Sequence, residues 1–256
     1  MRPLSLTSFP VPLTFSAMGL EEDALIEIVV EVTGDTPDFE SLGDAMNCLA
    51  SVLSWGACPA RGLGVTERPA VTLLPADVTG SEYRQSLRTR GLHPSAYRLL
   101  LTTLAQSHYD LIALKRAQVR AAGIGDALTF DDILDAGYPG PPALLPFALQ
   151  IPDDLPALDE LVFRIRFTTS DVSRIFPDVR KRLNEWNNLV IIGAYVGTFE
   201  EADLQILPRE TVERYADTIE HWIGAVSLNR AAVDGLLNVL CRIHGAINPI
   251  VELQIE

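Results

Sequence analysis

Hydrophobic residues recur with two different periods near the start of the chain. Over residues 24–33 they occupy every second position, as a strand with one buried face requires: Ile26, Ile28, Val30 and Val32. Over residues 36–53 they recur every three or four positions, as a helix with one buried face requires: Phe39, Leu42, Met46, Leu49 and Leu53. Thr36 and Pro37 suit the start of this helix, because threonine caps a helix N-terminus and proline fits its first turn.

The second half of the chain repeats the pattern of the first. Four residues with helical spacing match at an offset of 136 positions: Tyr97, Leu101, Leu104 and His108 against Val233, Leu237, Leu240 and His244. Strand positions match in the same order: Ile26, Ile28 and Val30 against Phe163, Ile165 and Phe167. A repeat of this length is typical of a duplicated domain rather than of a solenoid unit.

Each half reads β-α-β-β-α-β once a preceding strand and an extra helical segment after the third strand are set aside. This order predicts an α+β fold of two tandem ferredoxin-like (split β-α-β) repeats that form a pseudo-dimer. We place the first repeat at residues 1–120, a linker at 121–143 and the second repeat at 144–256. We expect the two sheets to pack face to face or to join edge to edge.

Charges on equivalent strand faces suggest where the two sheets meet. Glu27 and Glu31 lie on the polar face of one strand, and Arg164 and Arg166 lie on the matching face of the other. Contact between these two faces would therefore join opposite charges. Three further segments are predicted from local pattern: a short helix at 81–91, a buried strand at 189–192 and a helix at 209–223.

Acidic residues outnumber basic residues by 34 to 20, so the formal net charge is −14 at pH 7. Because Lys and Arg supply the affinity for phosphate backbones, a nucleic-acid partner is not expected, whereas a basic protein would be attracted. No apolar run is long enough to span a bilayer, and no secretory signal is recognisable. The three cysteines, Cys48, Cys58 and Cys241, are odd in number and lack metal-ligand spacing, so we expect free thiols rather than disulfides or a metal site. Free thiols favour a reducing, cytoplasmic location.

No recognised catalytic motif is present. A Gly-x-Ser-x-Gly elbow is absent, and the glycine pairs at 62–64 and 123–125 lack the context of a phosphate loop. His108 and His244 occupy equivalent helix ends, but neither has a second ligand at metal spacing. We therefore expect structural roles for both histidines, and we predict no catalytic residue, no metal and no cofactor.

The acidic clusters are the best candidates for a functional surface. One cluster covers residues 21–31, a second follows residue 152 and a third adjoins an aromatic residue that could anchor a partner. The predicted partner-binding residues are Glu21, Glu22, Asp23, Glu27, Glu31, Asp153, Asp154, Phe199, Glu200, Glu201 and Asp203. A face that only meets water is the alternative.

With these acidic residues, few cysteines and no catalytic motif, the chain resembles bacterial polymorphic-toxin immunity proteins as a class. The resemblance implies a non-enzymatic inhibitor that neutralises a cognate toxin by docking on its basic surface, and the basic cleft of a nuclease would suit an acidic partner. Two other hypotheses remain. One is a duplicated α+β-barrel enzyme or cofactor-binding protein that uses His108 or His244, and the other is a structural or regulatory component of an assembly.

Overall fold

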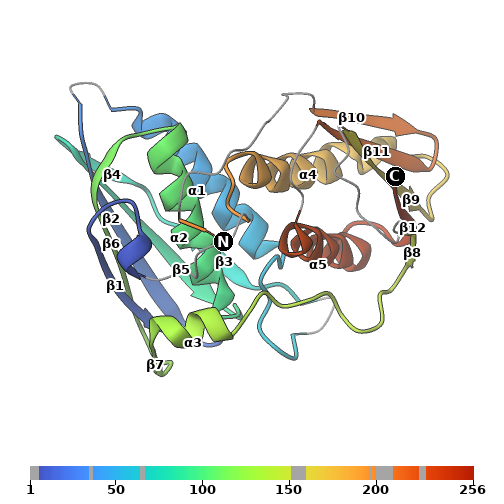
Figure 1. The fold of residues 1–256 in the computed structure, drawn as a ribbon. Coiled ribbons are helices and arrows are strands. Elements are labelled where there is room, and N and C mark those ends of the chain that lie inside the picture. The colour runs from blue at the N-terminus through green and yellow to red at the C-terminus, as the bar shows by residue number, and fades with distance from the viewer. Residues whose placement is uncertain are drawn as a thin grey trace.

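The protein is a mixed α+β structure with its sheets on the outside and its helices between them (Figure 1). The computed structural model describes residues 6–34, 37–63, 67–150, 160–195, 198–199, 210–224 and 229–256. Within these residues there are two sheets and five α-helices. None of the described helices is both long and apolar enough to cross a membrane.

The first sheet is built from residues of the N-terminal half. Its strands lie in the order β3 (Ala70–Leu73), β5 (Glu82–Arg90), β2 (Ala24–Val32), β6 (Leu114–Gly123), β1 (Leu13–Met18) and β7 (Ala127–Leu128), and β4 (Asp77–Thr79) also pairs with β5. β1 runs parallel to β6, and every other pair in this sheet is antiparallel. β2 is central, and its side chains alternate between buried and more exposed positions, as its sequence pattern predicts.

The five strands of the second sheet follow the order of five strands of the first, and β4 and β7 have no counterpart among the described residues. Its strands are β10 (Glu210–Tyr215), β11 (Thr218–Gly224), β9 (Glu160–Phe167), β12 (Ile250–Ile255) and β8 (Ala148–Gln150). β8 runs parallel to β12 and the other pairs are antiparallel, so each strand has a counterpart with the same neighbours and direction in the first sheet.

The helices are α1 (Phe39–Ser54), α2 (Ser95–Asp110), α3 (Phe130–Asp135), α4 (Phe176–Ile191) and α5 (Arg230–Ala246), with short 3-10 turns η1 (Leu6–Ser8) and η2 (Val172–Arg174). The side chain of Asp38 caps α1 by accepting a hydrogen bond from the Ser41 amide at 3.0 Å. Thr36, which the sequence suggested as this cap, lies outside the described residues. Asn229 caps α5 in the same way through the Ala232 amide at 3.0 Å.

The two halves meet through their helices, with α1 against α4. Ser51 donates a hydrogen bond to Glu185 at 2.6 Å, and Arg182 donates to the same carboxylate at 2.7 Å. The ring of Trp55 lies between two guanidinium groups, those of Arg68 and Arg182, each 4.7 Å from the ring centroid. This polar and aromatic contact joins segments more than 100 residues apart in the chain.

The expectation that the charged sheet faces meet each other is wrong. The helices lie between the sheets, so these faces are on the outside (Figure 1). Their charges are neutralised within each sheet instead, by cross-strand pairs at 2.5–3.6 Å: Glu27–Arg84, Glu31–Lys115, Glu31–Arg116, Arg164–Glu220, Arg164–Glu256 and Arg166–Glu252. Opposite charges on adjacent strands attract each other across a sheet just as they would between sheets.

Three predicted elements are also wrong. Residues 82–90 form β5 rather than a helix, and residues 210–224 form the hairpin of β10 and β11. In both segments every second side chain is buried, as in a strand, but some of the buried residues are polar, such as Gln85 and His221. These polar residues obscured the alternation of hydrophobic and polar positions in the sequence. The apolar run at 189–192 belongs to the end of α4, where Leu189 and Val190 are buried. A short apolar run does not distinguish a buried strand from a buried helical turn.

Candidate functional site

Part of the predicted acidic surface lies beside a hollow at one end of the first sheet. Glu21, Glu22 and Asp23 lie in the loop between β1 and β2, and Asp126 lies in the loop between β6 and β7. We call these four residues the acidic rim. The hollow has a volume of about 400 Å³, and its walls include Glu21, Glu22, Asp126 and the side chain of Ile124.

Backbone contacts hold the two loops of the acidic rim together. The Gly19 amide donates a hydrogen bond to the Asp126 carbonyl oxygen at 2.8 Å, and the Ile124 amide donates to the Asp23 carbonyl oxygen at 3.4 Å. A Cβ on Gly125 would lie 2.6 Å from the Gly19 carbonyl oxygen, so this close approach requires glycine. The carboxylates therefore sit on a fixed backbone rather than on independent loops.

The acidic rim differs from the other predicted acidic residues in its exposure. Glu21, Glu22 and Asp23 are exposed, and none of them forms an ion pair with any other described residue. Glu27 and Glu31, by contrast, are engaged with basic residues of their own sheet. Beside the rim, Ile124 is 75% exposed, which makes it a large apolar side chain on an acidic surface.

The remaining predicted residues divide into two groups. Five lie outside the described residues: Asp153, Asp154, Glu200, Glu201 and Asp203. Phe199 is described, and its predicted role as an exposed anchor is wrong because it is 1% exposed. Its ring packs edge-on against Phe9 at 5.2 Å and lies 6.3 Å from Phe130. Phe199 therefore ties a loop of the second half to the first half.

His108 and His244 have matching structural positions. In each case Nδ1 accepts a hydrogen bond at 3.0 Å from a backbone amide six residues later, from Leu114 in one half and Ile250 in the other. Each contact links the end of a helix to the strand that follows, which is β6 or β12. Within the described parts of the chain, no group of three or more His, Cys, Asp or Glu side chains could hold a metal ion.

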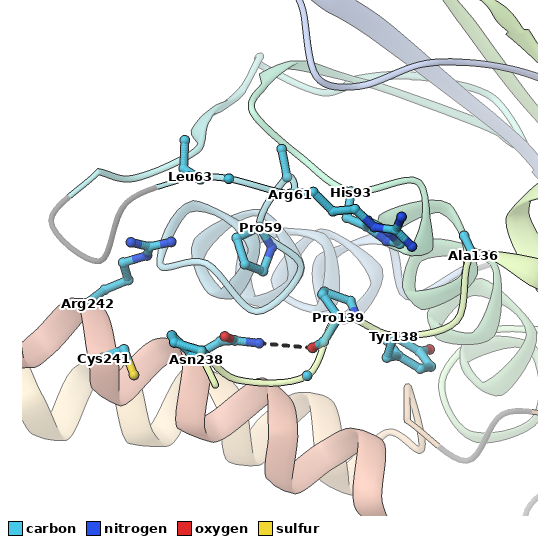
Figure 2. A pocket seen from close by; sticks show the side chains of 14 residues that line it. Pro59, Arg61, Leu63, His93, Ala136, Tyr138, Pro139, Asn238, Cys241 and Arg242 are labelled. Carbon is cyan, nitrogen blue, oxygen red and sulfur yellow. Dashed lines mark hydrogen bonds between the residues drawn. The ribbon is translucent and has the colours of Figure 1, made fainter. Parts of the chain in front are cut away.

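A second hollow, the junction pocket, lies where the two halves meet (Figure 2). Its walls come from the loop at 59–63 after α1, from His93 before α2, from the connection at 136–142 and from Asn238, Cys241 and Arg242 of α5. Its volume is about 400 Å³. The Asn238 side-chain amide donates a hydrogen bond to the Pro139 carbonyl oxygen at 3.1 Å and so fixes the connection against α5.

His93 is one of the buried titratable groups that line the junction pocket. Its Nδ1 accepts a hydrogen bond from the Ser95 amide at 3.3 Å and lies 3.0 Å from the Ser95 hydroxyl oxygen. Burial lowers the pKa of His93, and the positive charge of Arg61 lowers it further, while Glu21 opposes both effects. The ring is therefore neutral at pH 7, and because Nδ1 accepts from an amide, Nε2 carries the proton.

The thiols near the junction pocket are unreactive. Burial raises the pKa of Cys58 to about 12 and that of Cys241 to about 11. Because the thiolate is the nucleophile, neither cysteine is activated at neutral pH. The arrangement in the pocket is suited to binding through guanidinium and imidazole donors rather than to nucleophilic attack by sulfur.

Sequence reasoning did not find the junction pocket. Its residues come from four segments that are far apart in the chain, and none of these segments carries a motif. Two features of the sequence come from these segments. The proline-rich stretch at 138–142 indicated only a connection between the halves, and the glycine-rich segment beginning at residue 62 indicated only a loop. Neither signal specifies which side chains face a common space.

Comparisons with known proteins do not assign the chain to a family. No protein-family model matches it, and no curated protein matches it. Among solved structures, a chain of complex III2 from Candida albicans with Inz-5 bound aligns over 85% of this chain and 69% of its own length. The sequence identity is 9% and the TM-score is 0.21, a similarity too low to establish a shared fold.

Proposed function

We propose that the protein is a non-enzymatic binding protein whose acidic rim docks on a basic surface of a partner protein, as an immunity protein docks on its cognate toxin. The observation that carries the proposal is the set of exposed carboxylates beside Ile124, held on two loops that glycine contacts lock together. Charges that are not engaged within the protein remain available to a partner.

Physical considerations favour this surface over the outer faces of the sheets. The carboxylates of Glu27 and Glu31 would have to give up Arg84 and Lys115 before they could bind a partner. The acidic rim has no such competing pairs among the described residues, and the net charge of −14 would steer a basic protein toward the molecule. Ile124 supplies the apolar contact that a charged rim alone lacks.

We also infer that the two halves are tandem ferredoxin-like repeats that form a pseudo-dimer. The equal strand orders and directions support this inference, and so do the matching hydrogen bonds of His108 and His244. In this arrangement each helical layer is covered by the other repeat. The loops at the ends of the sheets are then the natural surfaces for a partner.

The test begins by capturing partners of the full chain from native lysate at low and high salt, followed by identification and purification of the bound protein. Its affinity is then measured for the variant Glu21→Lys/Glu22→Lys/Asp23→Lys. The control variant makes the same change in charge at exposed acidic residues away from the rim: Glu40→Lys/Asp44→Lys/Asp77→Lys.

We expect the rim variant to weaken binding by at least about a hundredfold, because each reversed charge meets a basic surface, and the control variant to weaken it by less than about fivefold. The remaining effect of the control would disappear at high salt, since long-range attraction between exposed charges is screened. Equal losses in the two variants would overturn the proposed site. A partner that binds the rim variant normally, or no partner at either salt concentration, would overturn the proposed function.

A further inference from the structure

We propose that the junction pocket binds a small organic anion, whose carboxylate or phosphate group is held by Arg61 and His93 and whose apolar part lies against the proline walls. None of the described residues that line the site belongs to the acidic rim, and the site requires no protein partner. It would make the protein a small-molecule binder in addition to any docking role.

The charge of the pocket is opposite to that of the chain. Arg61 and Arg242 line it beside the neutral ring of His93, and no Asp or Glu is among the described residues that do so. In a protein with 34 acidic and 20 basic residues, a cavity whose charged walls are all cationic concentrates anions locally. Two carboxylates act electrostatically on these side chains, Glu21 on His93 and Glu67 on Arg242, and neither is among the residues that line the space.

His93 presents a hydrogen-bond donor whose direction is set by the fold. Its Nδ1 is occupied by Ser95, so the Nε2–H group is the ring donor that remains for a ligand. Arg61 lies beside the ring (Figure 2) and adds a planar guanidinium group, which suits carboxylate and phosphate oxygens. Arg61 is exposed and forms no ion pair with any described residue.

The other walls indicate an organic ligand rather than a bare ion. Pro59, Leu63, Pro139 and Pro142 line the space together with the polar residues. A volume of about 400 Å³ lies in the range of small-molecule sites, which combine apolar walls with a few fixed polar groups. The ring of Tyr138 forms a further wall, and the guanidinium of Arg98 stacks on it at 5.2 Å.

The pocket is formed before any ligand binds, because its walls are fastened to one another. Asn238 holds the connection through Pro139, and the amide of His93 donates to the Cys58 carbonyl oxygen at 3.0 Å. Arg242, which is 5% exposed, lies at the far end of the pocket from Arg61 and packs against Gly56 (Figure 2). A preformed site does not have to order loops when it binds, and this favours affinity.

Calorimetric titration of the full chain at low ionic strength tests the proposal with three probes of similar shape. Phenyl phosphate and benzoate carry the two candidate groups, and benzamide is the neutral control. We expect at least one anion to bind at least about tenfold more tightly than benzamide, because a charged hydrogen bond is lost with the neutral probe. Which of the two anions binds more tightly identifies the group that the site prefers.

Two variants separate the pocket from general attraction of anions. Arg61→Gln removes an exposed guanidinium and should leave folding intact, yet it should weaken binding of the preferred anion by at least about tenfold. Arg90→Gln removes an exposed arginine that does not line the pocket and should change the affinity by less than about twofold. Equal binding of all three probes, no binding of either anion, or unchanged affinity in Arg61→Gln would overturn the proposal.

A second readout is the ring NMR signal of His93. Binding of the preferred anion should shift this signal and raise the pKa of the ring, because a negative charge favours the imidazolium form. The signal of His221, which is buried in the second half, should not move. Shifts of equal size at both histidines would indicate a global change and would contradict binding at the junction pocket.

Discussion

His221 makes the stability of the second half dependent on pH. It lies on β11, is fully buried, and its ring contacts Phe163 and Trp186 at centroid distances of 6.2 Å. In the part of the chain that the structure describes, neither ring nitrogen has a hydrogen-bond partner. Burial lowers the pKa of His221 to about 3. The variant His221→Phe keeps an aromatic ring in this space. We predict that it abolishes the part of the acid-induced loss of unfolding free energy that His221 causes.

Proton linkage determines the direction in which His221 makes stability change with pH. The pKa is lower in the folded state than in the unfolded state, where it is near the ordinary value of 6.5. As the pH falls below that value, the unfolded chain binds a proton that the folded chain does not, so stability is lost. At pH 5 the loss is about 2 kcal/mol, and it stays near that size for any folded pKa below about 4. Above pH 7.5 the loss is negligible.

Urea unfolding of both proteins at pH 7.5 and pH 5.0, followed by tryptophan fluorescence, measures the effect. Two of the three tryptophans, Trp186 and Trp222, lie in the second half, and Trp186 contacts His221, so the signal includes the relevant region. The pKa values of carboxylates such as Glu31, Asp38 and Asp171 are lowered in the folded state, so their protonation in acid also lowers the stability of the protein. Their contribution is common to both proteins and cancels in the difference.

The stability advantage of the variant should therefore grow by about 2 kcal/mol between pH 7.5 and pH 5.0. At pH 7.5 the variant should already be at least as stable, because an unsatisfied polar ring is replaced by an apolar one. A difference that changes by less than about 0.5 kcal/mol between the two pH values would refute the reasoning, since the ring would then titrate with an ordinary pKa.

Three further predictions concern other parts of the structure. In native protein Cys48, which is partly exposed, should react with Ellman's reagent well before the two buried thiols, and rapid reaction of all three would contradict their burial. The double variant Arg164→Glu/Arg166→Glu should lose about 1–2 kcal/mol of unfolding free energy in urea titrations at low salt, because the new carboxylates would face the three acidic partners of the natural arginines, Glu220, Glu256 and Glu252. An unchanged value would mean that these pairs do not form in solution. Gly125→Ala should lower the melting temperature and weaken partner binding, because its Cβ would lie 2.6 Å from the Gly19 carbonyl oxygen. The control Gly140→Ala, where a Cβ meets open space, should do neither. Equal melting temperatures of the two variants would contradict the close contact of the rim loops.

Local periodicity was sufficient to predict many elements of each half. The alternation at 24–33 and the helical stripe from Leu42 to Leu53 match β2 and α1 closely, because each of these elements buries one apolar face. The His108 and His244 signatures were also placed at equivalent helix ends. The structural role that we expected for both residues agrees with their backbone hydrogen bonds.

The sequence failed where the buried face of an element is polar. Gln85 points into the core from β5 and accepts a hydrogen bond from the Tyr83 hydroxyl at 2.6 Å, so a polar residue is tolerated there. His221 is buried, and its ring nitrogens have no hydrogen-bond partner among the described residues. A local pattern cannot reveal such positions, because the groups that surround and satisfy a buried polar residue come from elsewhere in the fold.

By itself the sequence determined the acidic net charge, the succession of most elements and the repeated pattern, because these depend on residues close together in the chain. Tertiary structure decided that the helices, not the charged sheet faces, join the two halves. It also decided which carboxylates remain unpaired at the rim and which cationic side chains share the junction pocket. These outcomes depend on contacts between residues such as Ser51 and Glu185, which lie 134 positions apart. The free energy of such contacts exists only once the chain has folded, so no local pattern encodes them.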